Sequence, residues 1–568
     1  MSWPPSSPRY ALQRYRLIMA INPSFADACH ASAIALPTPF GAKITNIHAS
    51  AVTNFSLSSS PSAAGTKSQF SKLDFCNVTI SYTHPGQKDN VTVYVYLPPA
   101  LQWNGRFATA GGGGWGAMMS GGMTSIPAID AGFAVAETDA GVATDALTSA
   151  DWALLSPGNP DINRLEIFAS KALHDMAVIG KSVVGSFYGQ SPAYSYWIGC
   201  SQGGRQGVMM AQRYPGDFDG ILALAPAVNW GHFFPVMAWP HQRMYEEKAF
   251  PRACEFAALR DAAIEACDML DGVQDGVISA PELCNFDPIG KINQPFFCKD
   301  TNSTLHFTTA ATRIAQAAWT GPRGSDGKFL WYGYAMDADL SMITATTCKD
   351  AKSSNPANCT ANPFSNAASC DDEFADCTAV PFPLSDSWFR HWVTADPELD
   401  TTSLSRDDFT SLIHQGVQHY DSIIGTRDPD LSAFQKHGGK LLTWHGITDQ
   451  IIPFGGSTCY HDRVASLDPR VNDYFRLFLA PGTAHCLPGN GPFPYRALED
   501  LIEWVERGVA PERLVAQRIE DLDAETGLLR HDVERAGDRG RPLCLYPKRQ
   551  EYIGGDVGVM GSYRCVSP

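Results

Sequence analysis

The sequence predicts an α/β protein whose mostly parallel sheet is covered by helices on both faces and interrupted by a large insertion. Strands alternate with helices up to about residue 225, a long cysteine-rich stretch breaks this pattern, and strands resume near residue 440. The chain has 568 residues, of which 44% are hydrophobic and 18% charged. It can therefore bury a large core, and wholesale disorder is excluded.

The elements before the insertion are expected in a regular order. Residues 51–70 are rich in Ser, Ala and Gly and predict a surface loop before the first clear strand. Short apolar runs then predict strands at 91–97, 106–110, 132–136, 194–199 and 220–225, with helices at 163–188 and 204–214. Beyond the insertion, strands are expected at 440–445 and 474–479, followed by a helix at 495–508.

These elements divide the chain into three parts. We expect residues 1–230 and 440–568 to form the two halves of one core, and residues 231–439 to form an inserted lid domain. The lid is expected to be disulfide-rich, because eight of the 15 cysteines fall within it. A tract rich in Ser, Asn and Cys at 349–376 is expected to be its least structured part.

Charge and cysteine content narrow the functional classes. The net charge of −16 opposes binding to nucleic acid or anionic membranes, and no apolar window is long enough to cross a bilayer. The cysteines favour a secreted, glycosylated protein, as do the five N-x-Ser/Thr sequons at Asn54, Asn77, Asn90, Asn302 and Asn358. Residues 1–25 are a candidate targeting segment but an atypical one, since their apolar run is confined to residues 17–21.

The clearest chemical motif is Gly199-Cys-Ser-Gln-Gly203, a G-x-S-x-G sequence between an expected strand and an expected helix. In a nucleophile elbow, glycines permit the tight turn that lifts a serine hydroxyl clear of the sheet, and the helix N-terminus favours developing negative charge. The alternative is an ordinary glycine-rich turn. The strand-turn-helix context favours Ser201 as a nucleophile.

An elbow requires an acid and then a histidine, each following a later strand. Asp449 comes directly after the strand expected at 440–445, and His485 follows the one at 474–479. Taken singly, these residues could be a turn carboxylate and a loop histidine. Together, their order predicts a Ser201, Asp449, His485 triad.

Two cysteines flank this triad. Cys200 precedes Ser201, and Cys486 follows His485. A working Ser–His pair brings the neighbouring α-carbons within the span of a disulfide, so we predict the bridge Cys200–Cys486. The alternative is two buried free thiols.

A glycine run at 111–114 follows the expected strand at 106–110. In hydrolases of this architecture, the loop at this place supplies one backbone N–H of the oxyanion hole, and the residue after the nucleophile supplies the other. We therefore expect Gly112, Gly113 and Gln202 to line the oxyanion hole. The alternative is a flexible turn, because the Gly-Lys-Ser/Thr of a phosphate-binding loop is absent.

This set of motifs, Cys-Ser, Asp and His-Cys, resembles the tannase and feruloyl esterase family of α/β-hydrolases. The resemblance extends from about Cys29 to Cys565. It implies an α/β-hydrolase with an inserted lid. It also implies a secreted serine carboxylesterase that hydrolyses esters of aromatic acids, either hydroxycinnamic or gallic.

A second match to this family lies in the lid, at Cys267-Asp-Met-Leu-Asp-Gly-Val-Gln-Asp-Gly-Val277. From the residues alone, two Asp-Gly turns are the simpler interpretation, although three carboxylates on one loop suit a hard cation. The resemblance implies a structural Ca²⁺ ion. Its ligands would be the side chains of Asp268, Asp271 and Asp275 and the carbonyls of Val273 and Val277.

Further disulfides follow only from the resemblance, which implies the pairs Cys29–Cys76, Cys254–Cys459, Cys267–Cys284 and Cys544–Cys565. An odd number of cysteines then remains, so at least one thiol is free or pairs elsewhere. No organic cofactor is expected.

Two residues are considered for the acyl pocket. Trp388 could stack on an aromatic acyl group, and His445 could face the pocket from four residues before Asp449. The alternatives are local core packing for Trp388 and packing within the turn for His445.

The predicted reaction is serine esterase chemistry through an acyl-enzyme, with a small-molecule or polysaccharide-linked aromatic ester as substrate. A monomer or homodimer is expected. Two other functions remain open, since fold and triad do not set the substrate. One is a hydrolase of another ester, thioester or lactone, such as a fungal metabolite, and the other is a hydrolase-fold module that binds without catalysis.

Overall fold

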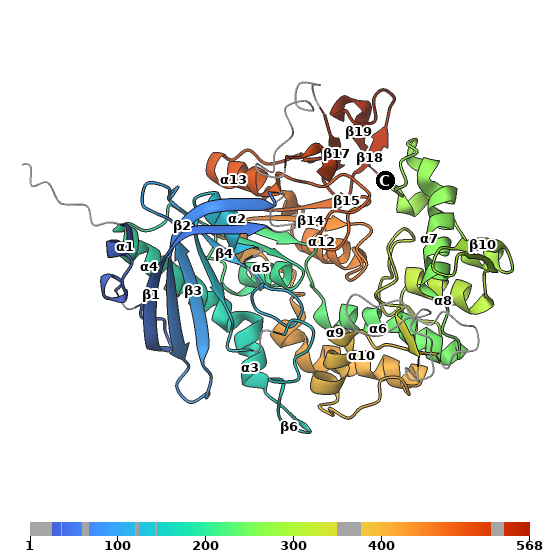
Figure 1. The fold of residues 1–568 in the computed structure, drawn as a ribbon, viewed down its shortest axis with the longest axis horizontal. Coiled ribbons are helices and arrows are strands. Elements are labelled where there is room, and N and C mark those ends of the chain that lie inside the picture. Colours follow the sequence, from blue (N-terminus) through green and yellow to red (C-terminus); the bar gives the residue numbers. More distant parts are fainter. Residues whose placement is uncertain are drawn as a thin grey trace, which may run out of the picture.

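The computed structural model describes residues 25–35, 37–58, 67–119, 122, 124–142, 145–348, 377–523 and 539–567. Its centre is a nine-stranded sheet in the order β1-β2-β3-β5-β4-β8-β9-β14-β15 (Figure 1). The strands from β5 to β15 in this order are all parallel, whereas β1, β2, β3 and β5 pair antiparallel. The predicted mostly parallel sheet is therefore confirmed. The strands are β1 (Lys43–Ser58), β2 (Gln69–Thr83), β3 (Val91–Leu97), β4 (Arg106–Ala110), β5 (Ala134–Thr138), β8 (Tyr194–Cys200), β9 (Gly220–Leu224), β14 (Lys440–Gly446) and β15 (Phe475–Ala480).

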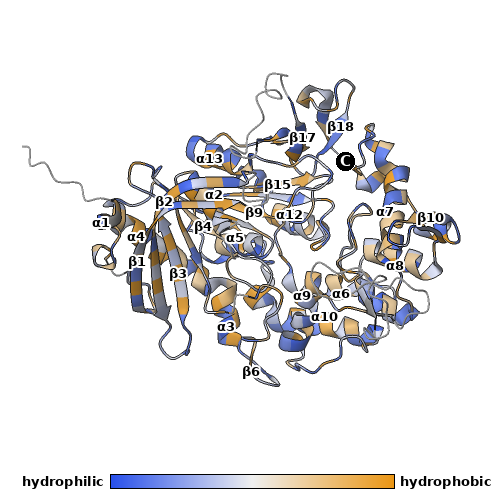
Figure 2. Ribbon diagram, in the orientation of Figure 1, coloured by the Kyte–Doolittle hydropathy of each residue, from blue (hydrophilic) through white to orange (hydrophobic). Residues whose placement is uncertain are grey.

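Burial explains why most of these strands could be recognised. Every residue of β5 and β9 is buried, because helices cover both faces of the parallel part of the sheet (Figure 2). β3 alternates buried and half-buried residues along its length. Both patterns are visible in a sequence.

The first strand corrects the prediction of a loop at 51–70. Residues 51–58 continue β1, pairing Ala51 with Cys76 and Ser58 with Gln69 of β2. β1 is an edge strand with no buried residue. The half-buried apolar residues of this part of β1, Val52, Phe55 and Leu57, are spaced irregularly because of bulges between them, so the stretch resembled a loop. Residues 59–66 lie outside the described part of the chain.

The two faces of the sheet carry separate hydrophobic cores. Neighbouring residues of β8 point to opposite sides, so Trp197 belongs to the core under α4, α5 and α12, and Tyr196 to the core under α2 and α13. The helix expected at 163–188 is interrupted by a π-helical turn at Ile167–Lys171. These covering helices are α2 (Ser125–Asp130), α3 (Ile162–Glu166), α4 (Ala172–Tyr188), α5 (Gln202–Arg213), α12 (Gly455–Leu467) and α13 (Ala497–Arg507).

The insertion leaves the sheet after β9 and returns at β14. These two strands are neighbours in the sheet, with Ile221 opposite Leu441, so residues 225–439 are added without breaking the sheet. The inserted helices gather to one side of the sheet (Figure 1). They are α6 (Trp230–Glu247), α7 (Ala253–Cys267), α8 (Thr309–Thr320), α9 (Pro383–Ser387), α10 (Arg406–Tyr420) and α11 (Ser432–Lys436), with strand pairs β10 (Pro295–Cys298)–β11 (Ser303–His306) and β12 (Thr346–Cys348)–β13 (Cys377–Ala379). The tract at 349–376 lies outside the described residues.

The C-terminal segment forms two small antiparallel pairs beside β15. β16 (Arg513–Ala516) pairs with β17 (Arg541–Cys544), and β18 (Arg549–Tyr552) pairs with β19 (Tyr563–Val566). Arg541 of β17 contacts Asp275 of the lid at 2.5 Å, so this segment also touches the insertion. Within the described residues, no helix combines the length and the apolar composition of a membrane span.

Five disulfides join described residues. Four of them, Cys29–Cys76, Cys200–Cys486, Cys267–Cys284 and Cys544–Cys565, have the expected partners. The expected Cys254–Cys459 pair is wrong, because Cys254 bonds to Cys298, and Cys459 is a free thiol. Cys254 lies in the first turn of α7, and Cys298 ends β10. These two lid elements pack together, whereas Cys459 lies on α12 of the core.

Candidate active site

Ser201 lies at the sharp turn between β8 and α5. Its φ of 62° and ψ of −122° are a strained conformation for any residue other than glycine, as expected at a nucleophile elbow. The turn needs glycine on either side. A Cβ on Gly199 would lie 2.5 Å from the carbonyl carbon of Gly203, and a Cβ on Gly203 would lie 2.9 Å from the oxygen of Gly112.

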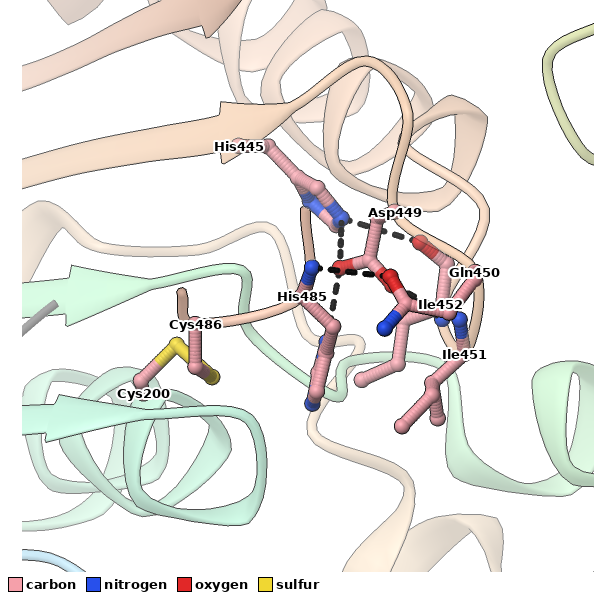
Figure 3. Close-up of a disulfide and its surroundings, with 8 residues drawn as sticks. All are labelled: Cys200, His445, Asp449, Gln450, Ile451, Ile452, His485 and Cys486. Carbon is pink, nitrogen blue, oxygen red and sulfur yellow. Dashed lines mark hydrogen bonds and ion pairs between the residues drawn. A yellow bond between two sulfur atoms is a disulfide. The ribbon is translucent and has the colours of Figure 1, made fainter. Parts of the chain in front are cut away.

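His485 follows β15 and faces Asp449, which follows β14 (Figure 3). The Nδ1 atom of His485 is 2.7 Å from Oδ2 of Asp449. The main-chain N–H of His485 donates to the side-chain oxygen of Gln450 at 3.0 Å, which holds the histidine loop against the acid loop. The pair thus has the acid–base geometry that a catalytic triad requires.

The Asp449 carboxylate is fully buried and held by four donors. Its Oδ1 accepts the N–H groups of Ile451 at 2.8 Å and Ile452 at 2.7 Å. Its Oδ2 faces the rings of His485 and His445. Burial would raise the pKa of Asp449, but the charge of His485 and the hydrogen bonds from both histidines outweigh burial and lower it. Asp449 is therefore ionised and able to stabilise an imidazolium.

The disulfide Cys200–Cys486 joins the nucleophile turn to the histidine loop (Figure 3). The two α-carbons are 5.9 Å apart, across 286 residues of sequence. Because each cysteine is the direct neighbour of a proposed catalytic residue, the bridge fixes the relative position of Ser201 and His485.

The oxyanion donors are only in part those expected from the sequence. The N–H of Gly112 donates to Oε1 of Gln206 at 2.9 Å, so it is committed within the protein. This corrects the expected role of Gly112. In the described structure, the N–H groups of Gly113 and Gln202 have no such partner. These two remain available to hold an oxyanion.

Gln206 is a site residue that the sequence reasoning missed. Besides accepting from Gly112, its Nε2 donates to the carbonyl of Ala117 at 3.1 Å, so it braces the glycine loop against α5. It lies one helical turn after Gln202, on the face of α5 directed toward that loop. Helical spacing from the elbow was the one signal that could have indicated it.

His445 is not a pocket residue, contrary to the expectation. Its side chain is fully buried, and its Nε2 is 3.1 Å from Oδ2 of Asp449 and 3.0 Å from the carbonyl of Ile452. It is the penultimate residue of β14, so its ring lies behind the acid, on the side away from His485 (Figure 3).

Trp388 is also placed differently from the expectation. Its side chain is 0% exposed, at the centre of an aromatic cluster that includes Trp115 and Tyr420 at ring-centroid distances of 6.3 and 5.3 Å. A side chain enclosed in this way cannot stack on a ligand. Trp388 instead packs the turn after α9 against the core, where its ring buries a large apolar area.

The acidic loop in the lid buries the side chains of Asp268 and Asp271, whereas Met269 and Leu270 on the same loop are exposed. Asp268 accepts the N–H groups of Asp275 at 3.1 Å and Gly276 at 3.0 Å, and Asp271 accepts that of Val273 at 2.9 Å. Burial raises the pKa values of Asp271 and Asp275, and Asp268 adds to this by its charge, while Arg541 opposes it. No described residue donates a hydrogen bond to the carbonyls of Val273 or Val277.

The carboxylates of this loop lie beside a positive charge of the protein itself. Three neighbouring carboxylates share one nearby cation, Arg541, so the cluster carries excess negative charge in a buried place. Oxygen ligands of this kind, completed by backbone carbonyls, are those that Ca²⁺ prefers.

The fold and the site together define an α/β-hydrolase. A serine at a strained strand–helix turn, a buried Asp–His pair at the ends of two later strands, and available N–H groups beside the serine are the features that an acyl-transfer site in this fold requires. Residues 76–566 match the tannase and feruloyl esterase family, and the chain belongs to this family of carboxylic ester hydrolases.

Individual relatives extend over most of the chain. It is 38% identical over 498 residues to a probable feruloyl esterase of Arthroderma benhamiae, covering 87% of this chain and 86% of that protein. It is 28% identical to a tannase of Aspergillus oryzae, covering 96% and 93%. Among solved structures, the tannin acyl hydrolase from Aspergillus niger superposes with a TM-score of 0.79 at 26% identity, covering 96% of both chains.

Proposed function

We propose that this protein is a serine carboxylesterase that hydrolyses esters of aromatic acids, hydroxycinnamic or gallic, through an acyl-enzyme. The substrate class is supported by the names of its relatives, which include a feruloyl esterase and a tannase. The serine mechanism is supported by one arrangement above all. The strained Ser201 turn is tied by Cys200–Cys486 to a histidine that is itself bonded to a buried carboxylate.

In the acylation step, Oγ of Ser201 attacks the ester carbonyl while Nε2 of His485 accepts its proton. Asp449 holds the imidazole through Nδ1, so Nε2 is the nitrogen left for the serine. The ionised carboxylate stabilises the imidazolium that forms. The N–H groups of Gln202 and Gly113 donate to the oxyanion of the tetrahedral intermediate.

Collapse of this intermediate breaks the ester C–O bond. The imidazolium of His485 gives its proton to the departing alcohol, and the acyl group stays on Ser201. In the second half, His485 takes a proton from water, and the hydroxide attacks the acyl-enzyme. The free acid leaves, and the proton returns to Ser201.

The test is hydrolysis of a panel by the purified protein beside Ser201→Ala. The panel contains a short-chain nitrophenyl ester, methyl ferulate, methyl caffeate and methyl gallate. We expect turnover of at least one aromatic methyl ester, reduced about 10³- to 10⁶-fold by the substitution. Serine-dependent turnover of the nitrophenyl ester alone would retain the mechanism and reject the substrate class. If the folded protein shows no turnover that depends on Ser201, the proposal that it is a serine esterase is rejected.

We also propose that the lid loop holds a structural Ca²⁺ ion. The carboxylates of Asp268, Asp271 and Asp275 and the carbonyls of Val273 and Val277 would hold it. The ion would neutralise the buried carboxylates and stiffen the loop between α7 and the C-terminal strands. It would take no part in the reaction.

Export from the cell is a further part of the proposal. Five disulfides among the described residues support folding in an oxidising compartment. Asn54, Asn90 and Asn302 are exposed and could carry glycans, whereas Oδ1 of Asn77 is buried. Asn358 lies outside the described residues.

A further inference from the structure

We propose that His445 is a positioning residue for the catalytic acid, and that it acts as a neutral imidazole protonated on Nε2. This inference rests on the proposed function, because it assigns a role within the same triad. It is carried by the contacts of a second, buried histidine that meets the oxygen of Asp449 also used by His485 (Figure 3).

The protonation of Nε2 follows from its partners. This nitrogen lies 3.1 Å from Oδ2 of Asp449 and 3.0 Å from the carbonyl oxygen of Ile452. A carboxylate and a carbonyl can only accept hydrogen bonds, so the nitrogen between them carries the proton. Its N–H is shared between the two oxygens.

The other nitrogen contacts a group that can serve as its hydrogen-bond donor. Nδ1 of His445 is 2.8 Å from the hydroxyl of Ser457, which lies on α12 and is itself buried. A serine hydroxyl can donate to a ring nitrogen or accept from it, and we assign the hydroxyl as the donor, which leaves Nδ1 without a proton. The chain Ser457–His445–Asp449–His485 thus runs from α12 to the proposed general base.

The physical effect of this chain is to fix Oδ2 of Asp449, the oxygen that the backbone does not hold. The backbone N–H groups of Ile451 and Ile452 hold Oδ1, and His445 holds Oδ2 from the side opposite to His485. With both oxygens held, the carboxylate cannot rotate away when the His485 ring becomes charged during turnover. A neutral His445 supplies this hydrogen bond without competing with the imidazolium for the negative charge of Asp449.

The experiment compares His445→Leu, which removes the donor, with His445→Gln, whose amide N–H reaches a similar position. His461→Leu is the matched control, because His461, on α12, is also a buried histidine. Turnover of the nitrophenyl ester gives kcat and KM for each variant, and thermal unfolding shows that each is folded. Ser457→Ala tests the far end of the chain.

We expect His445→Leu to lower kcat about 10- to 100-fold with little change in KM, the size of effect seen when a supporting hydrogen bond to a functional group is removed. His445→Gln should recover most of this loss, and His461→Leu should leave kcat near that of the wild type.

Equal kcat for His445→Leu and wild type would overturn the proposal. Equal losses in His445→Leu and His445→Gln would overturn it too, since that result indicates a packing role. The charge state is measured separately by NMR of histidine labelled with ¹⁵N, where a ring protonated on Nδ1, or on both nitrogens, would contradict the neutral Nε2–H form. This spectrum decides the assignment even if the protein shows no Ser201-dependent turnover, an outcome that would reject the proposed function instead.

Discussion

Cys200 and Cys486 form a disulfide that joins the residue before Ser201 to the residue after His485, with their α-carbons 5.9 Å apart. The proposed nucleophile, Ser201, directly follows β8, and His485 follows β15, at the far edge of the sheet. In most triads only packing and hydrogen bonds set this relationship. Here a disulfide fixes the relative position of the two residues, so its effect on stability and turnover can be measured by removing it.

Removing this bridge should weaken both the protein and the reaction. We expect Cys200→Ala/Cys486→Ala to lose about 2–5 kcal/mol of unfolding free energy, because the bridge closes a very long loop. Its kcat should fall at least about 10-fold, since misplacement of reacting groups by about 1 Å is costly. Denaturant unfolding and ester turnover measure the two effects.

The control for this variant is Cys544→Ala/Cys565→Ala, which removes a bridge between β17 and β19. It should lower stability while leaving kcat near the wild-type value. If both double variants lose kcat equally, the position of the Cys200–Cys486 bridge has no special role.

Trp388 should behave as a core residue. Trp388→Ala removes a fully buried indole from the aromatic cluster and is expected to cost about 3–5 kcal/mol of unfolding free energy. Trp388→Phe should cost less, and Leu155→Ala, at a residue 73% exposed, should cost under about 0.5 kcal/mol. If Trp388→Ala instead keeps the wild-type stability and raises KM for aromatic esters only, Trp388 has a role in substrate binding.

A buried histidine away from the active site should make stability depend on pH. The ring nitrogens of His84 lie 2.6 Å from Asp89 and 2.9 Å from Asp175. Burial by itself would lower the pKa of His84, but the hydrogen bonds to Asp175 and Asp89 outweigh it and raise the pKa. The resulting stabilisation is complete below about pH 6.5, the ordinary histidine value, and is lost as pH rises through the raised pKa of the folded state.

Unfolding free energies at pH 6 and pH 9 test this sign. The wild type should be less stable at pH 9, and His84→Gln should lose most of the difference while being less stable at pH 6. His30→Gln, which changes an exposed histidine, is the control. The idea of a protonated His84 between the two carboxylates would be contradicted if the wild type and His84→Gln both gained unfolding free energy between pH 6 and pH 9.

Chelation should destabilise the protein if the lid loop holds Ca²⁺. At a free concentration 100 times Kd, the ion would contribute about 2.7 kcal/mol, so Tm should fall by several degrees in EGTA and recover with added Ca²⁺. Asp271→Asn should lower Tm and abolish the response to EGTA, whereas Asp326→Asn, at an exposed loop carboxylate, should keep it. Identical melting of the wild type in EGTA and Ca²⁺ would reject the site.

Sequence reasoning reached the parallel strands and the order of the triad because both leave local signals. β9 is a continuous apolar run, and Ser201 stands in a glycine-flanked turn between a strand and a helix. It failed where the signal depends on a neighbour far along the chain. The alternation of β1 is broken by bulges that only its pairing with β2 reveals, and the partner of Cys254 is decided by the packing of α7 against β10.

The sequence by itself determined the class of fold, the position of the insertion along the chain, and the residues proposed for acyl transfer, because periodicity and turn chemistry are properties of short segments. Only the tertiary structure decided what each side chain near the site does. It committed the N–H of Gly112 to Gln206, buried Trp388 in the core, and turned His445 toward Asp449. These roles depend on which groups are close in space and which are cut off from water, and no single segment contains that information.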